Sequence, residues 1–162
     1  MAQTELFESK PKRKKPVMLT GRTRKFLEHE GWITALVERT LDVPKFKGNP
    51  FGERFRNKFD AFGFCDVLAV SPFIPGSLYI QVTDHTNHAK HREKLLSLSA
   101  PAVILQAGNQ IAIHSWKSVK RKGRRLWRLR VEAVKLVHGV LECVESDPRW
   151  FFDNMHEVDD NL

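Results

Sequence analysis

Two short apolar segments on either side of a Pro/Gly turn constrain the fold of this chain more than any other feature. Residues 64–70 (FCDVLAV) and 77–83 (SLYIQVT) are rich in β-branched and other apolar residues, and the turn between them contains two prolines and one glycine. Such segments are typical of buried strands, and a turn of this length joins antiparallel neighbours. The sequence therefore predicts a β-hairpin at the centre of the fold.

Helices and further strands are expected on both sides of this hairpin. The expected elements, in chain order, are a helix capped by Thr20 or Thr23 and ended by Gly31, a strand at 32–40, the hairpin, a helix at 88–98, a strand at 102–105, and two strands at 111–117 and 126–134. Helix 88–98 would make a right-handed crossover between strand 77–83 and a parallel strand 102–105. Residues 41–57 have no clear period and are expected to form a loop. This order predicts an α/β fold with a mixed sheet flanked by helices and a basic hairpin.

The chain of 162 residues is long enough for one domain with short tails. Residues 1–17 are expected to be a disordered basic tail, residues 18–141 the folded core, and residues 142–162 an acidic tail. There is no run of 18 apolar residues and no apolar leader, so we expect neither membrane association nor secretion. Two cysteines cannot form a disulfide scaffold, which favours a reducing, cytoplasmic location.

The charge is distributed unevenly along the chain. Of 27 basic and 19 acidic residues, one base and seven acids lie in residues 142–162, which leaves 26 bases and 12 acids, a net charge of +14, in residues 1–141. A domain with this charge attracts polyanions, of which nucleic acid is the commonest and an anionic membrane surface a rarer one. The alternative is a basic protein without a polyanionic partner.

The densest group of basic residues is a predicted hairpin at 117–130, which contains eight bases and no acids between Trp116 and the end of the segment. Such a cluster binds phosphates without reading base sequence, and a two-stranded ribbon can enter a groove of duplex DNA. The alternative is a solvated loop with its tryptophans in the core. The residues expected to contact nucleic acid are Lys117, Lys120, Arg121, Lys122, Arg124, Arg125 and Arg128.

Three polar residues interrupt the two central strands. Gln81 and Thr83 are two positions apart and therefore share one face of their strand. If the strands pair through the turn, Asp66 approaches both of them. An ionised carboxylate is costly inside a sheet unless it is paired or holds a metal, so Asp66 marks either a metal site or a salt bridge to an arginine.

The segment FGFCDVLAV, followed by a turn, LYIQVT and a polar helix, resembles the core of the PD-(D/E)xK nuclease superfamily, which includes restriction endonucleases, archaeal-type Holliday junction resolvases and VRR-type nucleases. The resemblance covers about residues 20–116. It implies a restriction-endonuclease-like fold, in which an Asp on one strand and a Glu-x-Lys on the next bind Mg²⁺ or Mn²⁺ and stabilise charge. By this resemblance Asp66 and Gln81 are metal ligands, and Thr83 occupies the lysine position.

Two positions depart from the superfamily's pattern. Gln81 offers a neutral carbonyl oxygen in place of a carboxylate, and Thr83 supplies no positive charge. A lysine on the following helix can reach back to the site because its side chain is long and flexible. The residues that could replace the missing groups are Lys90 or Lys94 for the ammonium, Asp60 or Asp84 for a carboxylate, and Glu28 or Glu30 for an upstream metal ligand.

Three functions remain open from the sequence. The first is a Mg²⁺- or Mn²⁺-dependent DNA endonuclease with Asp66, Gln81, Thr83 and Lys90 as catalytic residues, for which the resolvase resemblance implies duplex or branched DNA and allows a homodimer. The second is a catalytically degenerate DNA-binding module of the same fold, and the third a basic assembly or adaptor protein. A transition-metal site is the rival interpretation of three histidines spaced by three residues, His85, His88 and His91.

Overall fold

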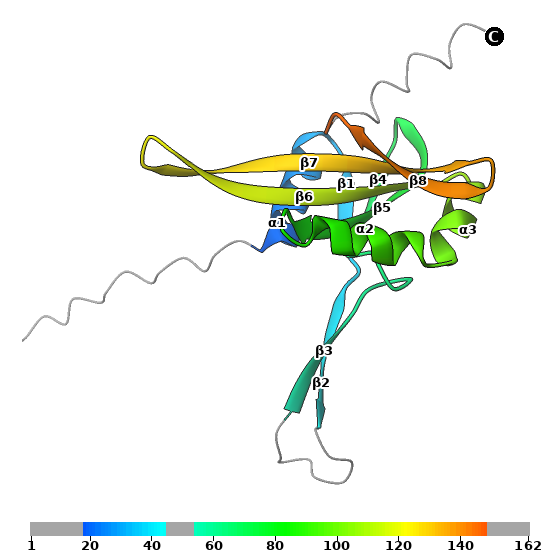
Figure 1. Ribbon diagram of the computed structural model, residues 1–162, viewed down its shortest axis with the longest axis horizontal. Coiled ribbons are helices and arrows are strands. Elements are labelled where there is room, and N and C mark those ends of the chain that lie inside the picture. The colour runs from blue at the N-terminus through cyan, green and yellow to red at the C-terminus, as the bar shows by residue number, and fades with distance from the viewer. Residues whose placement is uncertain (1–17, 45–53, 149–162) are drawn as a thin grey trace, which may run out of the picture.

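The protein is described by a computed structural model that covers residues 18–44 and 54–148, with the side chains of residues 41–44 and 54–57 left out (Figure 1). A six-stranded mixed sheet with three helices forms the body, and a two-stranded hairpin projects from it. The elements are α1 (Leu19–His29), β1 (Ile33–Leu36), β2 (Arg39–Pro44), β3 (Arg54–Phe59), β4 (Val67–Ser71), β5 (Ile74–Asp84), α2 (His88–Leu96), α3 (Ala100–Gln106), β6 (Gln110–Arg121), β7 (Arg124–Val137) and β8 (Val140–Ser146).

The strand order of the large sheet is β1-β4-β5-β6-β7-β8. β4 and β5 pair in antiparallel fashion through the predicted turn, so the central hairpin is confirmed. β5 and β6 are parallel, and α2 and α3 form the connection between them. The remaining neighbours are antiparallel. The α/β class with a mixed sheet and helices is therefore confirmed.

Apolar side chains pack on both faces of the sheet. On one face, which we call the α1 face, Leu27 of α1 packs with Ile80 and Trp116, and the indole Nε1 of Trp116 donates a hydrogen bond to Thr23 Oγ1 at 2.9 Å. On the opposite face, the α2 face, Leu95 of α2 packs with Ile113 of β6 and with residues of α3. Because side chains alternate along a strand, Ile80 and Val82 of β5 face α1, and Gln81 and Thr83 lie on the α2 face.

The prediction of a strand at 102–105 is wrong. These residues belong to the helix α3, with Pro101 in its first turn, and the parallel partner of β5 is β6. A run of four apolar residues does not distinguish a buried strand from a short buried helix. The proline indicates the helix, since its fixed φ and missing N–H are tolerated at a helix start.

The prediction of a loop over residues 41–57 is also wrong where the structure describes the chain. β2 and β3 pair from Arg39↔Phe59 to Pro44↔Arg54, and residues 45–53 lie outside the described residues. This hairpin extends away from the body (Figure 1). Because it lies against no core, it does not need the alternation of apolar residues by which strands are recognised.

The basic hairpin is longer and more regular than expected. β6 continues to Arg121 and β7 begins at Arg124, so residues 117–125 are strand apart from a two-residue turn at Lys122 and Gly123, both with positive φ. Positive φ at both central residues gives the turn a twist that matches paired strands. β6 pairs with β5 only as far as Trp116, so residues 117–128 form a two-stranded ribbon beyond the sheet (Figure 1). We call this ribbon the basic arm.

The C-terminal boundary of the core also differs from the expectation. Residues 142–146, assigned above to an acidic tail, belong to β8, which pairs with β7 at Glu132↔Glu145. Cys143 and Val144 lie between the acids Glu142 and Glu145, and the high acidic content of the segment as a whole hid this short strand. The predicted disordered basic tail at 1–17, and the part of the predicted acidic tail from residue 149 to 162, lie outside the described residues.

Candidate functional site

Asp66 lies directly before β4 and is fully buried. The register Val67↔Ile80 brings it against β5, where its Oδ2 accepts hydrogen bonds from the Val82 backbone N–H at 2.7 Å and from Gln81 Nε2 at 2.6 Å. Its Oδ1 accepts a hydrogen bond from Lys58 Nζ at 3.0 Å. The structure thus brings Asp66 and Gln81 together, as the strand pattern predicted.

The ammonium of Lys58 lies among three carboxylates. Its Nζ is 2.5 Å from Glu38 Oε2, 3.0 Å from Asp66 Oδ1 and 3.8 Å from Asp60 Oδ1. Each of the three acids offers an oxygen, and these oxygens lie within 4.8 Å of one another. We call Glu38, Asp60 and Asp66 the carboxylate cluster. Glu38 precedes β2 and Asp60 follows β3, so the cluster lies where the β2–β3 hairpin joins the body.

Burial and ion pairing oppose each other at this cluster. Burial raises the pKa of Asp66 to about 6, although the hydrogen bonds from Val82 and Lys58 act to lower it. Burial acts to lower the pKa of Lys58, but its hydrogen bonds to Glu38 and Asp66 raise that pKa above the usual value. Asp66 therefore titrates much closer to neutral pH than an ordinary aspartate does.

The chemistry of the cluster fits a hard divalent cation. Carboxylate and amide oxygens are the ligands that Mg²⁺ and Mn²⁺ prefer. The amide oxygen of Gln81 is buried and has no hydrogen-bond partner among the described residues, while its amide nitrogen is held by Asp66. A metal ion bound between the carboxylates would take the place of the Lys58 ammonium, which balances their charge in this structure.

A pocket of about 320 Å³ lies beside the cluster. It is formed where the start of α1, the end of β5 and α2 meet the root of the β2–β3 hairpin, and Lys58, Glu38 and Thr83 contribute to its wall. The Thr83 hydroxyl donates a hydrogen bond to the Asp84 carbonyl at 3.2 Å. His91 of α2 also lines the pocket, and burial, followed by the nearby Lys94 ammonium, lowers its pKa.

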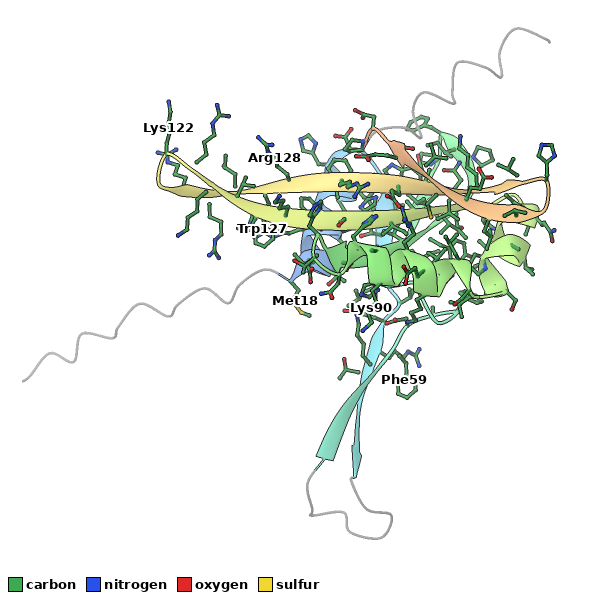
Figure 2. The ribbon with its side chains drawn as sticks, in the orientation of Figure 1. Met18, Phe59, Lys90, Lys122, Trp127 and Arg128 are labelled. Atoms are coloured by element: carbon green, nitrogen blue, oxygen red, sulfur yellow. The ribbon has the colours of Figure 1, made fainter. Side chains whose placement is uncertain are left out.

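The structure separates several of the other predicted site residues from Asp66. Lys94 Nζ is 3.4 Å from Asp60 Oδ2, so it contacts the cluster through that residue, whereas Lys90 is exposed on α2 (Figure 2). Glu28 of α1 accepts hydrogen bonds from Arg24 and Thr34 and is not part of the carboxylate cluster.

The remaining predicted acids also have other partners. Asp84 accepts hydrogen bonds from the backbone and side chain of Asn87. Glu30 lies 3.6 Å from the His29 imidazole. Neither belongs to the group of acids within 4.8 Å of one another.

Sequence reasoning missed Glu38 and Lys58, which lie beside Asp66 where Glu28 and Lys90 were expected. The register Arg39↔Phe59 makes them neighbours across the β2–β3 hairpin, and this pairing was hidden by the expectation of a loop. The available signal was the segment KFD at 58–60, which sets a lysine and an acid just before the Gly-containing turn that leads to Asp66.

The three histidines do not converge. His88 is buried, and its Nε2 is 2.9 Å from Glu132 Oε1, whereas His91 lines the pocket and His85 is exposed. Across residues 18–44 and 54–148, the carboxylate cluster is the one group of three or more acid, histidine or cysteine side chains close enough to share a metal ion. The described residues therefore do not provide the transition-metal site that the histidine spacing suggested.

The basic arm presents all seven predicted phosphate-binding residues to solvent. Arg130, at its root, is already paired with Glu132 and Glu145, each at 3.0 Å. The Arg22 guanidinium lies 4.2 Å from the centre of the Trp127 ring. Trp127 therefore contacts α1 and does not offer a free ring for base stacking. This agrees with the alternative in which the tryptophans belong to the core.

None of the helices in the described part of the chain is long and apolar enough to cross a membrane. Comparisons of the chain with models of protein families, with curated proteins and with solved structures find no match.

Proposed function

We propose that the protein is a divalent-metal-dependent DNA endonuclease and that the carboxylate cluster holds its metal ion. One observation carries this proposal: three carboxylates offer oxygens within 4.8 Å of one another, one of them, Asp66, is fully buried, and another, Glu38, lines a pocket. Mg²⁺ or Mn²⁺ held there would activate a water for attack on phosphorus and would neutralise the charge of the scissile phosphate. Asp66 and Gln81 fix each other's orientation through their hydrogen bond.

The strand order supports a restriction-endonuclease-like fold for this domain. A helix, an antiparallel sheet of β1, β4 and β5, a helical crossover and the parallel strand β6 follow one another in the order that the resemblance to PD-(D/E)xK nucleases implies. Asp66, directly before β4, lies opposite Gln81 of the neighbouring strand β5. The proposal therefore takes the chain as a divergent member of that superfamily, with Glu38 and Asp60 as acids outside the usual motif.

Lys58 is proposed to supply the positive charge that Thr83 lacks. Its ammonium contacts Asp66 and Glu38 and also lines the pocket. If a metal ion were bound by the carboxylates, this ammonium would be free to face the phosphate, where it would stabilise the negative charge that develops as water attacks. Lys94, which pairs with Asp60, is the nearest second candidate.

The proposal is tested by nicking of supercoiled plasmid and of four-way-junction DNA across a series of Mg²⁺ and Mn²⁺ concentrations. Asp66→Asn and Glu38→Gln should abolish cleavage and leave DNA binding intact, because they remove charge from the cluster and keep its shape. Gln81→Glu should lower the metal concentration needed for activity, because it adds a carboxylate. Glu28→Gln, which removes an acid outside the cluster, is the matched control and should cleave like the wild type.

A DNA-binding module without catalysis is the second candidate. The observation that favours it is the Lys58 ammonium, which already balances the cluster without a metal ion. The two candidates differ in their response to Mn²⁺. If the cluster binds the ion, Mn²⁺ should raise the melting temperature of the wild type, and it should raise that of Lys58→Met more because the competing ammonium is gone. Unchanged melting temperatures in both proteins, with no cleavage of any substrate, would leave only the binding module.

A further inference from the structure

The basic arm has two different faces. Cross-strand pairs in the arm are Lys117↔Arg128, Ser118↔Trp127, Val119↔Leu126, Lys120↔Arg125 and Arg121↔Arg124. Since side chains alternate along each strand, Lys117 and Arg128 share one face, and Lys120 and Arg125 share the other. Figure 2 shows Trp127 and Arg128 on opposite sides of the ribbon.

The register of the sheet connects one of these faces to the carboxylate cluster. Thr83 pairs with Ser115, and Ser115 pairs with Arg130, so these residues lie in a row across the α2 face, beside Gln81. Two residues further along each strand, the same face carries Lys117 and Arg128. This side of the arm is therefore continuous with the face of the sheet on which Gln81 holds Asp66.

The α1 side is covered where the arm leaves the sheet. There Trp127 packs under the Arg22 guanidinium, and Trp116 is held by Thr23 of α1. On the α2 side, Lys117 and Arg128 are exposed. Nearer the carboxylate cluster the α2 face is itself buried at Ser115, Thr83 and Gln81, so the surface open to a ligand on this side is that of the arm.

The α2 side of the arm suits the backbone of a duplex better than unpaired bases. Its side chains are four bases, Lys117, Arg121, Arg124 and Arg128, with Val119 and Leu126 between them. Among the described residues of the arm, the one aromatic ring, that of Trp127, lies on the other side. Proteins that bind single strands provide aromatic rings on which bases stack, and this surface offers none.

The arm is also long enough to follow an extended ligand. Arg121 lies six residues beyond Ser115, the partner of Thr83, which corresponds to about 20 Å of strand. This length equals roughly six phosphates of one DNA strand at about 3.4 Å each. A mononucleotide or a free phosphate is too small to contact the whole of this length.

We propose that duplex DNA lies along the α2 side of the basic arm, so that Lys117 and Arg128 contact its phosphates while Lys120 and Arg125 do not. This inference rests on the proposed function for the identity of the ligand and adds the surface that the ligand occupies.

The test compares two double variants that are matched in charge, composition and cross-strand pairing. Lys117→Gln/Arg128→Gln alters the α2 side, and Lys120→Gln/Arg125→Gln alters the opposite side. Both are made in the full chain with Asp66→Asn, so that cleavage does not interfere. Binding of a fluorescent duplex of about 20 base pairs, roughly two helical turns, is followed by anisotropy over a series of salt concentrations.

Two lost phosphate contacts should reduce the slope of log affinity against log salt by about 1.8. We expect this reduction for Lys117→Gln/Arg128→Gln and less than half of it for Lys120→Gln/Arg125→Gln. Both variants lose two positive charges, so general attraction to DNA changes equally. Equal slopes, or a larger reduction in the second variant, overturn the proposed side. Tighter binding of single-stranded DNA of the same length by the Asp66→Asn protein overturns the duplex as ligand.

The outcome is separate from that of the catalytic proposal. If the protein never cleaves DNA but the two arm variants differ as expected, the endonuclease proposal is refuted and the proposal about the arm stands. If cleavage is metal-dependent but the two arm variants bind DNA alike, the endonuclease proposal stands and the proposal about the arm is refuted. Circular dichroism of both variants checks that the solvent-exposed substitutions leave the fold intact.

Discussion

Replacing Lys58 by methionine tests the electrostatics of the carboxylate cluster directly. The Lys58 ammonium is 3.0 Å from the carboxylate of Asp66, which is fully buried. At an effective dielectric constant of about 20, two unit charges at this separation attract each other by about 5.5 kcal/mol. The Lys58 side chain is 51% exposed, so solvent screens the pair, and we take roughly half of this value, about 3 kcal/mol.

The loss of this attraction should depend on pH. Burial already raises the pKa of Asp66 to about 6, and about 3 kcal/mol corresponds to a further rise of roughly 2 pH units in the variant. A carboxyl with a raised pKa in the folded state stabilises the fold at low pH, and this contribution is lost as pH rises through the folded pKa. The loss ends near pH 6 in the wild type and should continue to about pH 8 in Lys58→Met. The deficit in unfolding free energy should therefore grow by about 2.5 kcal/mol between about pH 5 and about pH 8.

Urea denaturation of both proteins at several pH values measures this deficit. In an Asp66→Asn background the growth with pH should disappear, because the titrating carboxyl is gone. Lys94→Met is the matched control, since Lys94 is also about half exposed and pairs with Asp60, not with Asp66. A Lys58→Met deficit that is constant across this pH range, or whose pH dependence persists without Asp66, would refute the reasoning.

Two further predictions concern the body of the fold. Gly76→Ala should destabilise the fold clearly more than Gly108→Ala in urea denaturation. Both glycines have positive φ, which penalises a side chain by roughly 1–2 kcal/mol. A Cβ at Gly76 would in addition lie 2.5 Å from the Gly108 carbonyl oxygen, whereas a Cβ at Gly108 would meet nothing within 4 Å. Equal losses would show that the turn relaxes. Burial lowers the pKa of His114 to about 3, so the wild type should lose stability as pH falls below the unfolded histidine pKa of about 6.5, by up to about 1.4 kcal/mol per pH unit. His114→Leu should flatten this loss in denaturation curves between about pH 4.5 and about pH 6.5, and an unchanged slope would assign the loss to other groups.

The elements that could be predicted from the sequence are those whose apolar residues show that a face of the element is buried. β4 and β5 are recognisable because their apolar residues face a core and the turn between them contains prolines and a glycine. The β2–β3 hairpin carries no such pattern, because it pairs outside the body, and α3 is too short for a helical period to appear. Local patterns therefore identified the centre of the sheet and failed where an element has no core face or only two turns.

The candidate site was predictable to the same extent. Asp66 and Gln81 stood out as polar residues in apolar strands, and the structure brings them together. Glu38 and Lys58 lie in ordinary polar surroundings in the sequence, and only the pairing of β2 with β3 makes them neighbours of Asp66. A contact between residues 20 positions apart depends on strand register, which a single sequence does not specify for a hairpin without a buried face.

The alternation of side chains in the basic arm also limits how this protein can change in evolution. One residue inserted into β6 between Ser115 and Lys117 would turn every later basic side chain of that strand to the opposite side, whereas a cross-strand pair added or removed at the tip leaves the root unchanged. Each such step changes the length of the arm by about 3.3 Å. Descendants of this chain are therefore expected to vary in arm length at the Lys122–Gly123 turn and to conserve the spacing between the sheet and Lys117.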